Sequence, residues 1–173
     1  MKLFLVGYAG SGKSTFAKML SRRLACRYVD TDKHVEQMVG ASVADIFFYE
    51  GEEYFRRSER EALESVAQGD DNLIIATGGG LPTWSDNMEW MNREGVTIYL
   101  RRSAEQILGR LSDYGREKRP LFRGKSDEEL LEFMRSQMAE RETYYAKSQI
   151  VVECTSMSDE AAVDYIANIV TNL

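Results

Sequence analysis

Residues 3–14 read LFLVGYAGSGKS, and this stretch decides the fold class. The four apolar residues Leu3–Val6 have the length and character of a buried strand. Residues 7–14 fit the pattern G-x-x-x-x-G-K-[ST], a loop that binds phosphate groups. From about Lys13 onward, apolar residues recur at steps of three and four, which predicts a helix. Strand, glycine-rich turn and helix in this order are the context that the motif requires.

The rest of the chain repeats this alternation of short apolar runs and longer amphipathic segments. Four more strands are predicted, at Arg27–Asp30, Leu73–Thr77, Thr97–Leu100 and Ile150–Val152. Helices are predicted at Lys13–Ala25, Asp32–Val39, Glu52–Ala67, Ser85–Arg93, Ala104–Leu111, Asp127–Tyr145 and Asp159–Val170. Strands that alternate with helices favour βαβ units, so we expect an α/β fold with a parallel sheet.

Two segments interrupt the alternation in a chain whose 173 residues predict one domain. The first, Val43–Glu64, is a charged helical insertion between the second and third strands. The second, Ser112–Ser126, has the glycine, proline and charge content of a mobile surface loop. Its basic residues are Arg116, Lys118, Arg119, Arg123 and Lys125. A basic loop in an acidic chain calls for an explanation, and a solvated run of charge is the simplest one.

The composition excludes several classes of protein. Apolar residues make up 43% of the chain and charged residues 29%, which is typical of a folded globular protein. The net charge of −6 argues against general binding to nucleic acid or to a membrane surface. The apolar runs fall far short of the ~18 residues that a membrane span needs, and the N-terminal run is too short for a signal peptide. We therefore expect a cytoplasmic protein, and a monomer, since the sequence shows no heptad seam or extended apolar patch.

The cysteine and histidine content narrows the possible chemistry. Cys26 and Cys154 lie far apart and lack the spacing of metal ligands, so we expect buried free thiols in a reducing compartment. His34 is the only histidine. A Cys/His zinc site and most Ser-His or Cys-His nucleophilic mechanisms are thereby excluded.

The residue types of the phosphate-binding loop have a chemical reason. Gly7, Gly10 and Gly12 permit the dihedrals and the close approach with which backbone N–H groups wrap phosphate oxygens. The helix that follows points its positive end at the anion. Lys13 adds a full charge for the β- and γ-phosphates, and the Ser14 hydroxyl is placed to ligate Mg²⁺. The motif predicts a bound nucleoside triphosphate, with ATP the expected one, but does not identify the phosphate acceptor.

Two carboxylates, Asp30 and Asp32, end the second predicted strand. Residues two apart in an extended chain point to the same face, so both can face the crevice at the carboxyl end of the sheet. One carboxylate can hold the water shell of a metal ion, and the other can orient or deprotonate an acceptor hydroxyl. The alternative is a helix N-cap at Thr31 or Asp32, since a helix begins just after them.

Two further groups follow along the chain. Arg56 and Glu59 are three residues apart on a predicted helix, where they can pair, and a paired arginine can bind both oxygens of a ligand carboxylate. An exposed ion pair is the alternative. The glycines of Thr77-Gly78-Gly79-Gly80 end the third strand, where a ligand can touch the bare backbone. A flexible turn is the alternative there.

Taken together, these motifs give the chain a resemblance to the shikimate kinase family. The set consists of GYAGSGKST, the DTD at 30–32, FRRSE at 55–59, TGGG at 77–80 and Arg-Pro-Leu at 119–121. It runs in the order and spacing of that family from the first strand to about Tyr145. The resemblance implies a three-layer α/β/α fold of the nucleoside monophosphate kinase type, with a five-stranded parallel sheet. It also implies a single P-loop domain over residues 1–173, with a substrate-binding insertion at about 32–64 and a lid at about 112–126.

The activity implied by the resemblance is transfer of the γ-phosphoryl group of ATP to the 3-hydroxyl of shikimate, with Mg²⁺ as cofactor. Lys13, Asp32 and Arg119 would be catalytic: Asp32 as the partner of the ring hydroxyls and possible base, Arg119 as the lid arginine. Asp30 would lie near the Mg²⁺ that Ser14 ligates. The implied ATP-binding residues are Gly10, Ser11, Gly12, Lys13, Ser14, Thr15, Arg110 and Arg119, with Arg110 stacking on adenine. The implied shikimate-binding residues are Asp32, Arg56, Gly78, Gly79, Gly80 and Arg141.

Some points stay open on the sequence. Thr143 stands where family members often carry a proline after the position of Arg141, so the helix can continue there. Arg116 or Lys118 could share the role of Arg119. Another small-molecule kinase, such as a gluconate or nucleotide kinase, and a catalytically silent ATP-binding module are the competing functions. A nucleotide acceptor would need base recognition, and a silent module would lack Lys13, Asp32 or the lid arginine.

Overall fold

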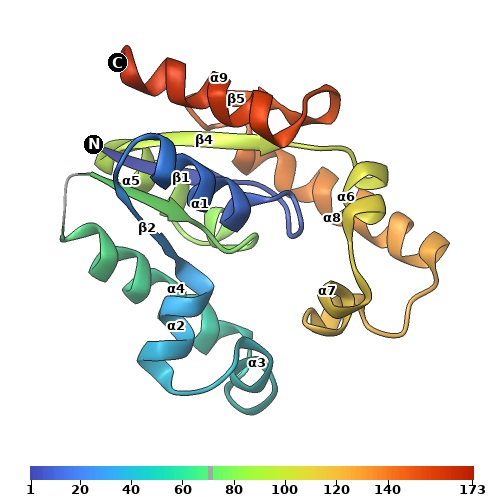
Figure 1. The fold of residues 1–173 in the computed structure, drawn as a ribbon. Coiled ribbons are helices and arrows are strands. Elements are labelled where there is room, and N and C mark those ends of the chain that lie inside the picture. The colour runs from blue at the N-terminus through green and yellow to red at the C-terminus, as the bar shows by residue number, and fades with distance from the viewer. Residues whose placement is uncertain (70–71) are drawn as a thin grey trace.

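The computed structural model describes residues 1–69 and 72–173, and at its centre lies a parallel five-stranded sheet (Figure 1). The strands are β1 (Lys2–Val6), β2 (Arg27–Asp30), β3 (Leu73–Ala76), β4 (Val96–Arg101) and β5 (Ile150–Glu153). Their order across the sheet is β2-β3-β1-β4-β5, and every neighbouring pair is parallel. The predicted strands are confirmed to within one residue at each end.

The central strand β1 shows why the sheet is buried on both faces. Leu3 and Leu5 belong to one apolar cluster, and Phe4 and Val6 belong to another on the opposite face. All four side chains are at most 3% exposed. A strand covered by helices on both faces reads as a continuous apolar run, which is what Leu3–Val6 is.

Helices form a layer on each side of the sheet (Figure 1). On one face, α1 (Lys13–Arg23) and α9 (Asp159–Thr171) pack against the strands through Phe16, Leu20 and Ile166. The other face is covered by α4 (Glu52–Ala67), α5 (Asn87–Glu94), α6 (Ala104–Arg110) and α8 (Asp127–Tyr145). The predicted three-layer α/β/α architecture is confirmed.

The insertion between β2 and β3 has a small core of its own. It contains α2 (Thr31–Val39) and α3 (Val43–Glu50), which pack on the first half of α4. Val35, Ile46, Phe55 and Ala62 are all at most 3% exposed there. This cluster lies apart from the two sheet cores, so the insertion is held together by contacts within itself.

The segment 112–126, predicted to be a loop, is partly helical. A short helix α7 (Asp113–Glu117) begins after Ser112, whose hydroxyl accepts a hydrogen bond from the Gly115 N–H. The 3₁₀ turn η2 (Pro120–Phe122) follows, and Phe122 is buried in the core beneath it. The expectation of an irregular loop is wrong over α7, because a serine N-cap supplies enough local stabilisation for a turn of helix.

The remaining features of the fold are two short turns and two free cysteines. The 3₁₀ turns η1 (Leu81–Thr83) and η3 (Cys154–Ser156) follow β3 and β5. Both cysteines are free, but only Cys154 is buried, so the prediction of two buried thiols is wrong for the half-buried Cys26. Across residues 1–69 and 72–173, no helix has the length and apolar character to span a membrane.

Candidate active site

Polar groups gather where β1, β2 and β3 end at one edge of the sheet. They line a crevice of about 320 Å³, which α6 and α7 border on the far side. The lining residues are Ala9, Gly10, Gly12, Lys13, Ser14, Thr15, Asp30, Asp32, Thr77, Gly79, Arg110, Leu111, Ser112, Gly115 and Arg119. Open α/β sheets bind ligands at this edge, and most of the predicted site residues lie there.

The phosphate-binding loop connects β1 to α1 and depends on its glycines. Gly10 and Gly12 have φ angles of 82° and 104°, in the left-handed region that favours glycine. At Gly7, an added Cβ would lie 2.9 Å from both the Leu100 carbonyl and the Ser11 hydroxyl, so no larger side chain fits. The Ser11 side chain is buried, and its hydroxyl has no hydrogen-bond partner within the described chain. A buried polar atom without a partner inside this loop fits an anion that would engage it.

Lys13 begins α1 and folds back over this loop. Its Nζ donates hydrogen bonds to the carbonyls of Gly7 and Tyr8, each at 2.8 Å. Burial lowers the pKa of the ammonium group to about 8, although the Asp32 carboxylate acts in the opposite direction. The ammonium group is held by two neutral carbonyl acceptors, which a charged phosphate oxygen can replace.

Asp30 uses its two oxygens for two different purposes. Oδ1 caps α2 by accepting from the backbone N–H groups of Asp32, at 3.1 Å, and Lys33, at 3.3 Å. Oδ2 accepts a hydrogen bond from the Ser14 hydroxyl. The alternative of an N-cap at Thr31 or Asp32 is therefore wrong, since Asp30 is the cap. One side chain both starts the helix and meets the predicted metal ligand Ser14.

Asp32 reaches the crevice from the first turn of α2 rather than from an extended strand. Burial and the nearby Asp30 carboxylate raise the pKa of its carboxyl to about 6, against the opposing charges of Lys13 and Arg56. Its Oδ1 has no hydrogen-bond partner among residues 1–69 and 72–173. Because Asp32 lines the crevice, its carboxylate is within reach of a ligand hydroxyl there.

A second buried carboxylate, Glu59, lies beside Asp32. Glu59 is 1% exposed, and its Oε2 accepts from Arg56 Nη1 at 2.5 Å. A Cβ added at Gly78 would collide with Glu59 Oε1 and lie 2.6 Å from Asp32 Oδ1, so both oxygens flank that glycine. Burial raises the pKa of Glu59 to about 7 against the opposing charge of Arg56. The sequence revealed Glu59 only as an ion-pair partner, because its burial depends on the packing of α4.

The predicted pairing of Arg56 with Glu59 is confirmed, and it is not the exposed pair of the alternative. The Arg56 side chain is 12% exposed and lies over the rings of Phe55 and Phe47. A Cβ at Gly80 would lie 2.5 Å from its Cζ, so the glycine makes room for the guanidinium group. The guanidinium group of Arg56 is therefore held in place by Glu59 and the glycine-rich turn.

The glycine-rich turn after β3 is tied down on both sides. The Gly78 N–H donates to the Thr31 hydroxyl at 2.9 Å, and the Tyr145 hydroxyl donates to the Gly79 carbonyl at 2.6 Å. These bonds contradict the alternative of a flexible turn. Thr31 and Tyr145 hold the bare backbone in place, and their role depends on long-range contacts that the sequence pattern does not reveal.

Arg141 approaches the same turn from α8. Its Nη1 would lie 3.6 Å from a Cβ at Gly79, and its guanidinium group lies over the Tyr8 ring, 5.7 Å from the centroid. The helix continues through Thr143 to Tyr145, as the missing proline allows. Arg56 and Arg141 thus lie against Gly80 and Gly79, on either side of the turn.

Among the three basic candidates in the segment 112–126, Arg119 is the one that lines the crevice. Its Nη1 donates to the Gly115 carbonyl at 2.7 Å, and burial lowers its pKa while Asp32 acts to raise it. Arg116 instead forms an ion pair with Asp127 at the start of α8, and Lys118 is exposed. The geometry therefore favours Arg119 over its two neighbours.

The structure groups the remaining predicted residues as follows. Arg110 lines the crevice and is ion-paired to Asp159 at 2.7 Å. Ser11, Arg56, Gly78, Gly80 and Arg141 are outside the crevice lining but adjoin it through the contacts above. Within the described residues, no three His, Cys, Asp or Glu side chains come together as a metal site. A cation here would need oxygens from its ligand and from water besides Ser14 and Asp30.

The chain is similar to known proteins in both sequence and fold. Residues 9–171 match the family model described as shikimate kinase. A shikimate kinase from Parabacteroides distasonis is 39% identical over 167 residues, which cover 96% of this chain and 95% of that protein. The crystal structure of shikimate kinase from Bacteroides thetaiotaomicron has a TM-score of 0.91 at 32% identity, over 99% of this chain and 98% of that one. Shikimate kinase from Acinetobacter baumannii in complex with shikimate has a TM-score of 0.86 at 29% identity, over 99% and 93%.

Proposed function

This chain belongs to the shikimate kinase family, and we propose that its crevice is where the γ-phosphoryl group of ATP moves to the 3-hydroxyl of shikimate. Its activity is the ATP-dependent phosphorylation of shikimate, a reaction of aromatic biosynthesis. The observation that supports the site assignment is the position of Lys13 and Asp32 in one crevice, each with hydrogen-bonding capacity to offer a ligand. The family match argues against the two competing functions, another small-molecule kinase and a silent ATP-binding module.

The nucleotide binds along the loop between β1 and α1. Gly10, Gly12 and Lys13 surround the phosphates with N–H groups and one ammonium group. Ser11 in the loop and Thr15 in the first turn of α1 complete the phosphate site. Arg110 stacks on adenine, and Arg119 reaches the phosphoryl group from the opposite side. The bonds from Lys13 Nζ to two neutral carbonyls support this assignment, because a charged phosphate oxygen is the stronger acceptor.

Shikimate binds against the glycine-rich turn. Arg56 and Arg141 take its carboxylate, since guanidinium forks suit two oxygens of one plane. Gly78, Gly79 and Gly80 let the ring approach the backbone. Asp32, which lines the crevice, accepts a hydrogen bond from the ring hydroxyls.

The transfer step moves one phosphoryl group from ATP to shikimate and one proton from shikimate to the protein. The 3-hydroxyl oxygen attacks the γ-phosphorus, a new P–O bond forms, and the bond to the β,γ-bridging oxygen breaks so that ADP leaves with the electron pair. The hydroxyl proton passes to the Asp32 carboxylate. Lys13 and Arg119 offset the charge on the transferring group, which is the larger part of catalysis in such reactions.

The donor set at the crevice also fits Mg²⁺. Ser14 and Asp30 present hydroxyl and carboxylate oxygens in contact with each other, and hard oxygen ligands suit this ion. When bound, Mg²⁺ would neutralise phosphate charge. Ser14 would hold it directly and Asp30 through water, so that the cap of α2 and the metal site share one side chain.

The segment at about 112–126 acts as a lid and the segment at about 32–64 as the substrate-binding insertion of a single domain. Closure of the lid would exclude water as a competing acceptor. A monomeric state, a cytoplasmic location and the absence of nucleic-acid or membrane partners stay predictions from the sequence.

A coupled assay of ADP release tests the proposed function. Shikimate is compared with gluconate, other hydroxy acids and nucleosides, and the phosphorylated product is identified by mass spectrometry. We expect ADP release above the background of the Lys13→Met variant with shikimate, and a product with one added phosphate at the 3-hydroxyl. Equal rates with gluconate or a nucleoside would contradict the proposal.

A further inference from the structure

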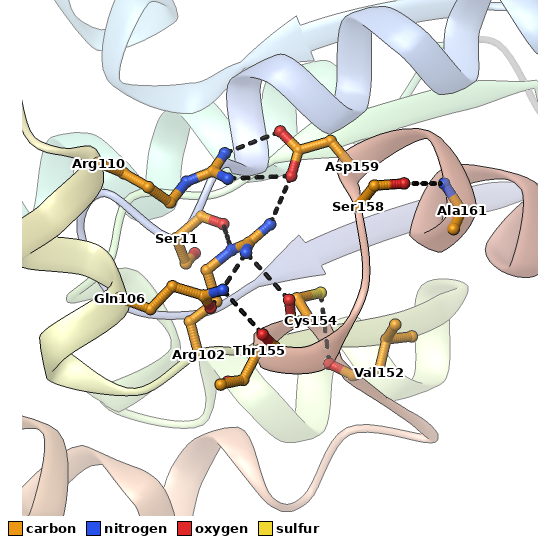
Figure 2. A network of polar contacts seen from close by, with 10 residues as sticks. All are labelled: Ser11, Arg102, Gln106, Arg110, Val152, Cys154, Thr155, Ser158, Asp159 and Ala161. Atoms are coloured by element: carbon orange, nitrogen blue, oxygen red, sulfur yellow. Dashed lines mark hydrogen bonds and ion pairs between the residues drawn. The ribbon is translucent and has the colours of Figure 1, made fainter.

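Arg102 is a buried charge at the back of the phosphate-binding loop that the transfer step does not use. It follows β4 directly, and its side chain has no exposed surface. Figure 2 shows its guanidinium group at the centre of a polar network. It donates to the Ser11 carbonyl at 2.9 Å, the Cys154 carbonyl at 3.1 Å, Gln106 at 3.2 Å and Asp159 at 2.7 Å. A guanidinium group has five N–H donors, so nearly all of its capacity is used.

The bond to Ser11 fixes one peptide of the loop. In a planar trans peptide, the carbonyl of one residue and the N–H of the next point in opposite directions. Arg102 Nε draws the Ser11 carbonyl to the rear of the loop, and the Gly12 N–H is thereby directed away from Arg102. Gly12 lines the crevice, so this N–H is turned to the side where the phosphates bind.

The bond to Asp159 links Arg102 to Arg110. Asp159 is the first residue of α9, and its two oxygens accept from Arg110 Nη1 at 3.1 Å and Nη2 at 2.7 Å. Arg110 Nη2 would lie 3.8 Å from a Cβ at Gly12, so the side chain sits beside the loop that Arg102 supports. A single carboxylate therefore holds both arginines (Figure 2).

The charges in this network favour an anion. One carboxylate faces two guanidinium groups, so a positive charge remains beside the loop. Burial acts to raise the pKa of Asp159, but the hydrogen bonds and charges of Arg110 and Arg102 outweigh it and hold the pKa below its usual value. Asp159 is thus ionised at neutral pH, and the network does not depend on a titration.

We propose that Arg102 is a positioning residue for ATP: it orients the Gly12 N–H for the phosphates and, through Asp159, holds Arg110 for the base. The phosphate end and the base end of the nucleotide site are then one connected unit. This inference rests on the proposed function, because it takes ATP to be the ligand of the crevice.

Two variants are expected to differ in how they bind ADP and inorganic triphosphate. Arg102→Lys keeps the charge but loses the fork, so both the loop and Arg110 lose their support. We expect its affinity for ADP and for inorganic triphosphate to fall about tenfold, the loss of one charge-assisted hydrogen bond. In Asp159→Asn, the amide offers the two arginines one acceptor oxygen in place of two, while Arg102 keeps its bonds to the Ser11 carbonyl, the Cys154 carbonyl and Gln106. Its affinity for ADP should fall several-fold while that for inorganic triphosphate stays within about twofold.

Calorimetry with ADP, inorganic triphosphate and shikimate measures these effects, and steady-state kinetics adds the KM for each substrate. The controls are Arg23→Lys and Asp164→Asn, which alter an exposed ion pair between α1 and α9. We expect both controls to match the wild type, and the Arg102→Lys and Asp159→Asn variants to raise the KM for ATP without changing that for shikimate.

Three results would overturn the inference. One is wild-type affinity for ADP and triphosphate in Arg102→Lys. Another is an equal loss for shikimate, which indicates a purely structural role. The third is an equal loss of ADP and triphosphate binding in Asp159→Asn. If Arg102→Lys does not fold, the ligand pattern of Asp159→Asn decides the question. A wild-type protein that binds neither nucleotide nor shikimate would instead contradict the proposed function.

Discussion

The two sides of the crevice are built in different ways. The phosphate side combines the backbone N–H groups of the loop with the charge of Lys13, and the buried Arg102 supports it from behind with donors that are almost all paired. The acceptor side uses side-chain charges, and Asp32 Oδ1 and Glu59 Oε1 are buried there without a partner in the described chain. Unpartnered buried carboxylate oxygens destabilise the free protein. The fold thus holds the backbone of the phosphate side in place and leaves the Ser11 hydroxyl without a partner in the described chain, whereas the acceptor side leaves two carboxylate oxygens without one.

The largest expected effect comes from removing the charge on the phosphate side. Lys13→Met should lower kcat by about a thousandfold, because no other ammonium group can take its place over the loop. ADP release measures the loss, and circular dichroism checks the fold. Lys18→Met, an exposed lysine on the same helix, is the control and should retain full activity. Retained kcat in Lys13→Met would mean that the loop works without this side chain.

On the acceptor side, Asp32→Asn tests the proposed proton acceptor. We expect kcat to fall about a hundredfold to ten-thousandfold, the usual contribution of a general base. In the wild type, kcat/KM for shikimate should rise with pH as Asp32 loses its proton near its pKa of about 6. That rise should be absent from the variant. A variant with unchanged kcat and the same pH profile would remove Asp32 from the reaction.

Arg56→Lys measures how much the acceptor side depends on a planar fork. A point charge cannot bind two carboxylate oxygens as a guanidinium group does, so the KM for shikimate should rise about tenfold or more while the KM for ATP stays constant. Arg57→Lys is the matched control, since Arg57 lies next on α4 in an exposed pair with Glu53. If both variants leave the KM for shikimate unchanged, Arg56 does not bind the substrate.

The smallest effect concerns stability. The pKa values of Asp32 and Glu59 are raised to about 6 and about 7, so the folded protein keeps protons that the unfolded chain has lost. Their contribution to stability is full below pH ~4 and is lost as the pH rises through these values. We expect Tm to fall by roughly 5 °C between pH 4 and 8, and to fall less in Asp32→Asn/Glu59→Gln. Equal slopes in the two proteins would show that these carboxylates are not the cause.

The fold could be predicted because its signals are local. Each strand is a short apolar run, and each helix has its own periodicity. The motif after β1 also identifies the first strand, the turn and the first helix in that order. The segment 112–126 was only partly predictable, because the N-cap at Ser112 is a weak signal among charged residues. The start of α2 was misplaced for a related reason: Asp30, the last residue of β2, also serves as the helix cap.

The site divides in the same way. The residues of the loop between β1 and α1 and of the glycine-rich turn stand together in the sequence, and the structure brings them to one crevice. Arg102, Asp159 and Tyr145 could not be found from the sequence, because their partners lie 91, 57 and 66 residues away along the chain. Their roles depend on packing that brings β4, α9 and α8 behind the strand ends.

The thiol of Cys154 lies in the network behind the nucleotide site and gives a way to observe it (Figure 2). The residue is fully buried, and burial raises its pKa to about 11. An alkylating reagent can therefore react with this thiol only when the connection between β5 and α9 opens. The other cysteine, Cys26, is half-buried on the β2 side of the molecule and serves as an internal reference. The ratio of the two labelling rates therefore measures how often the connection between β5 and α9 opens. Bound ATP should slow the reaction of Cys154 and leave that of Cys26 unchanged.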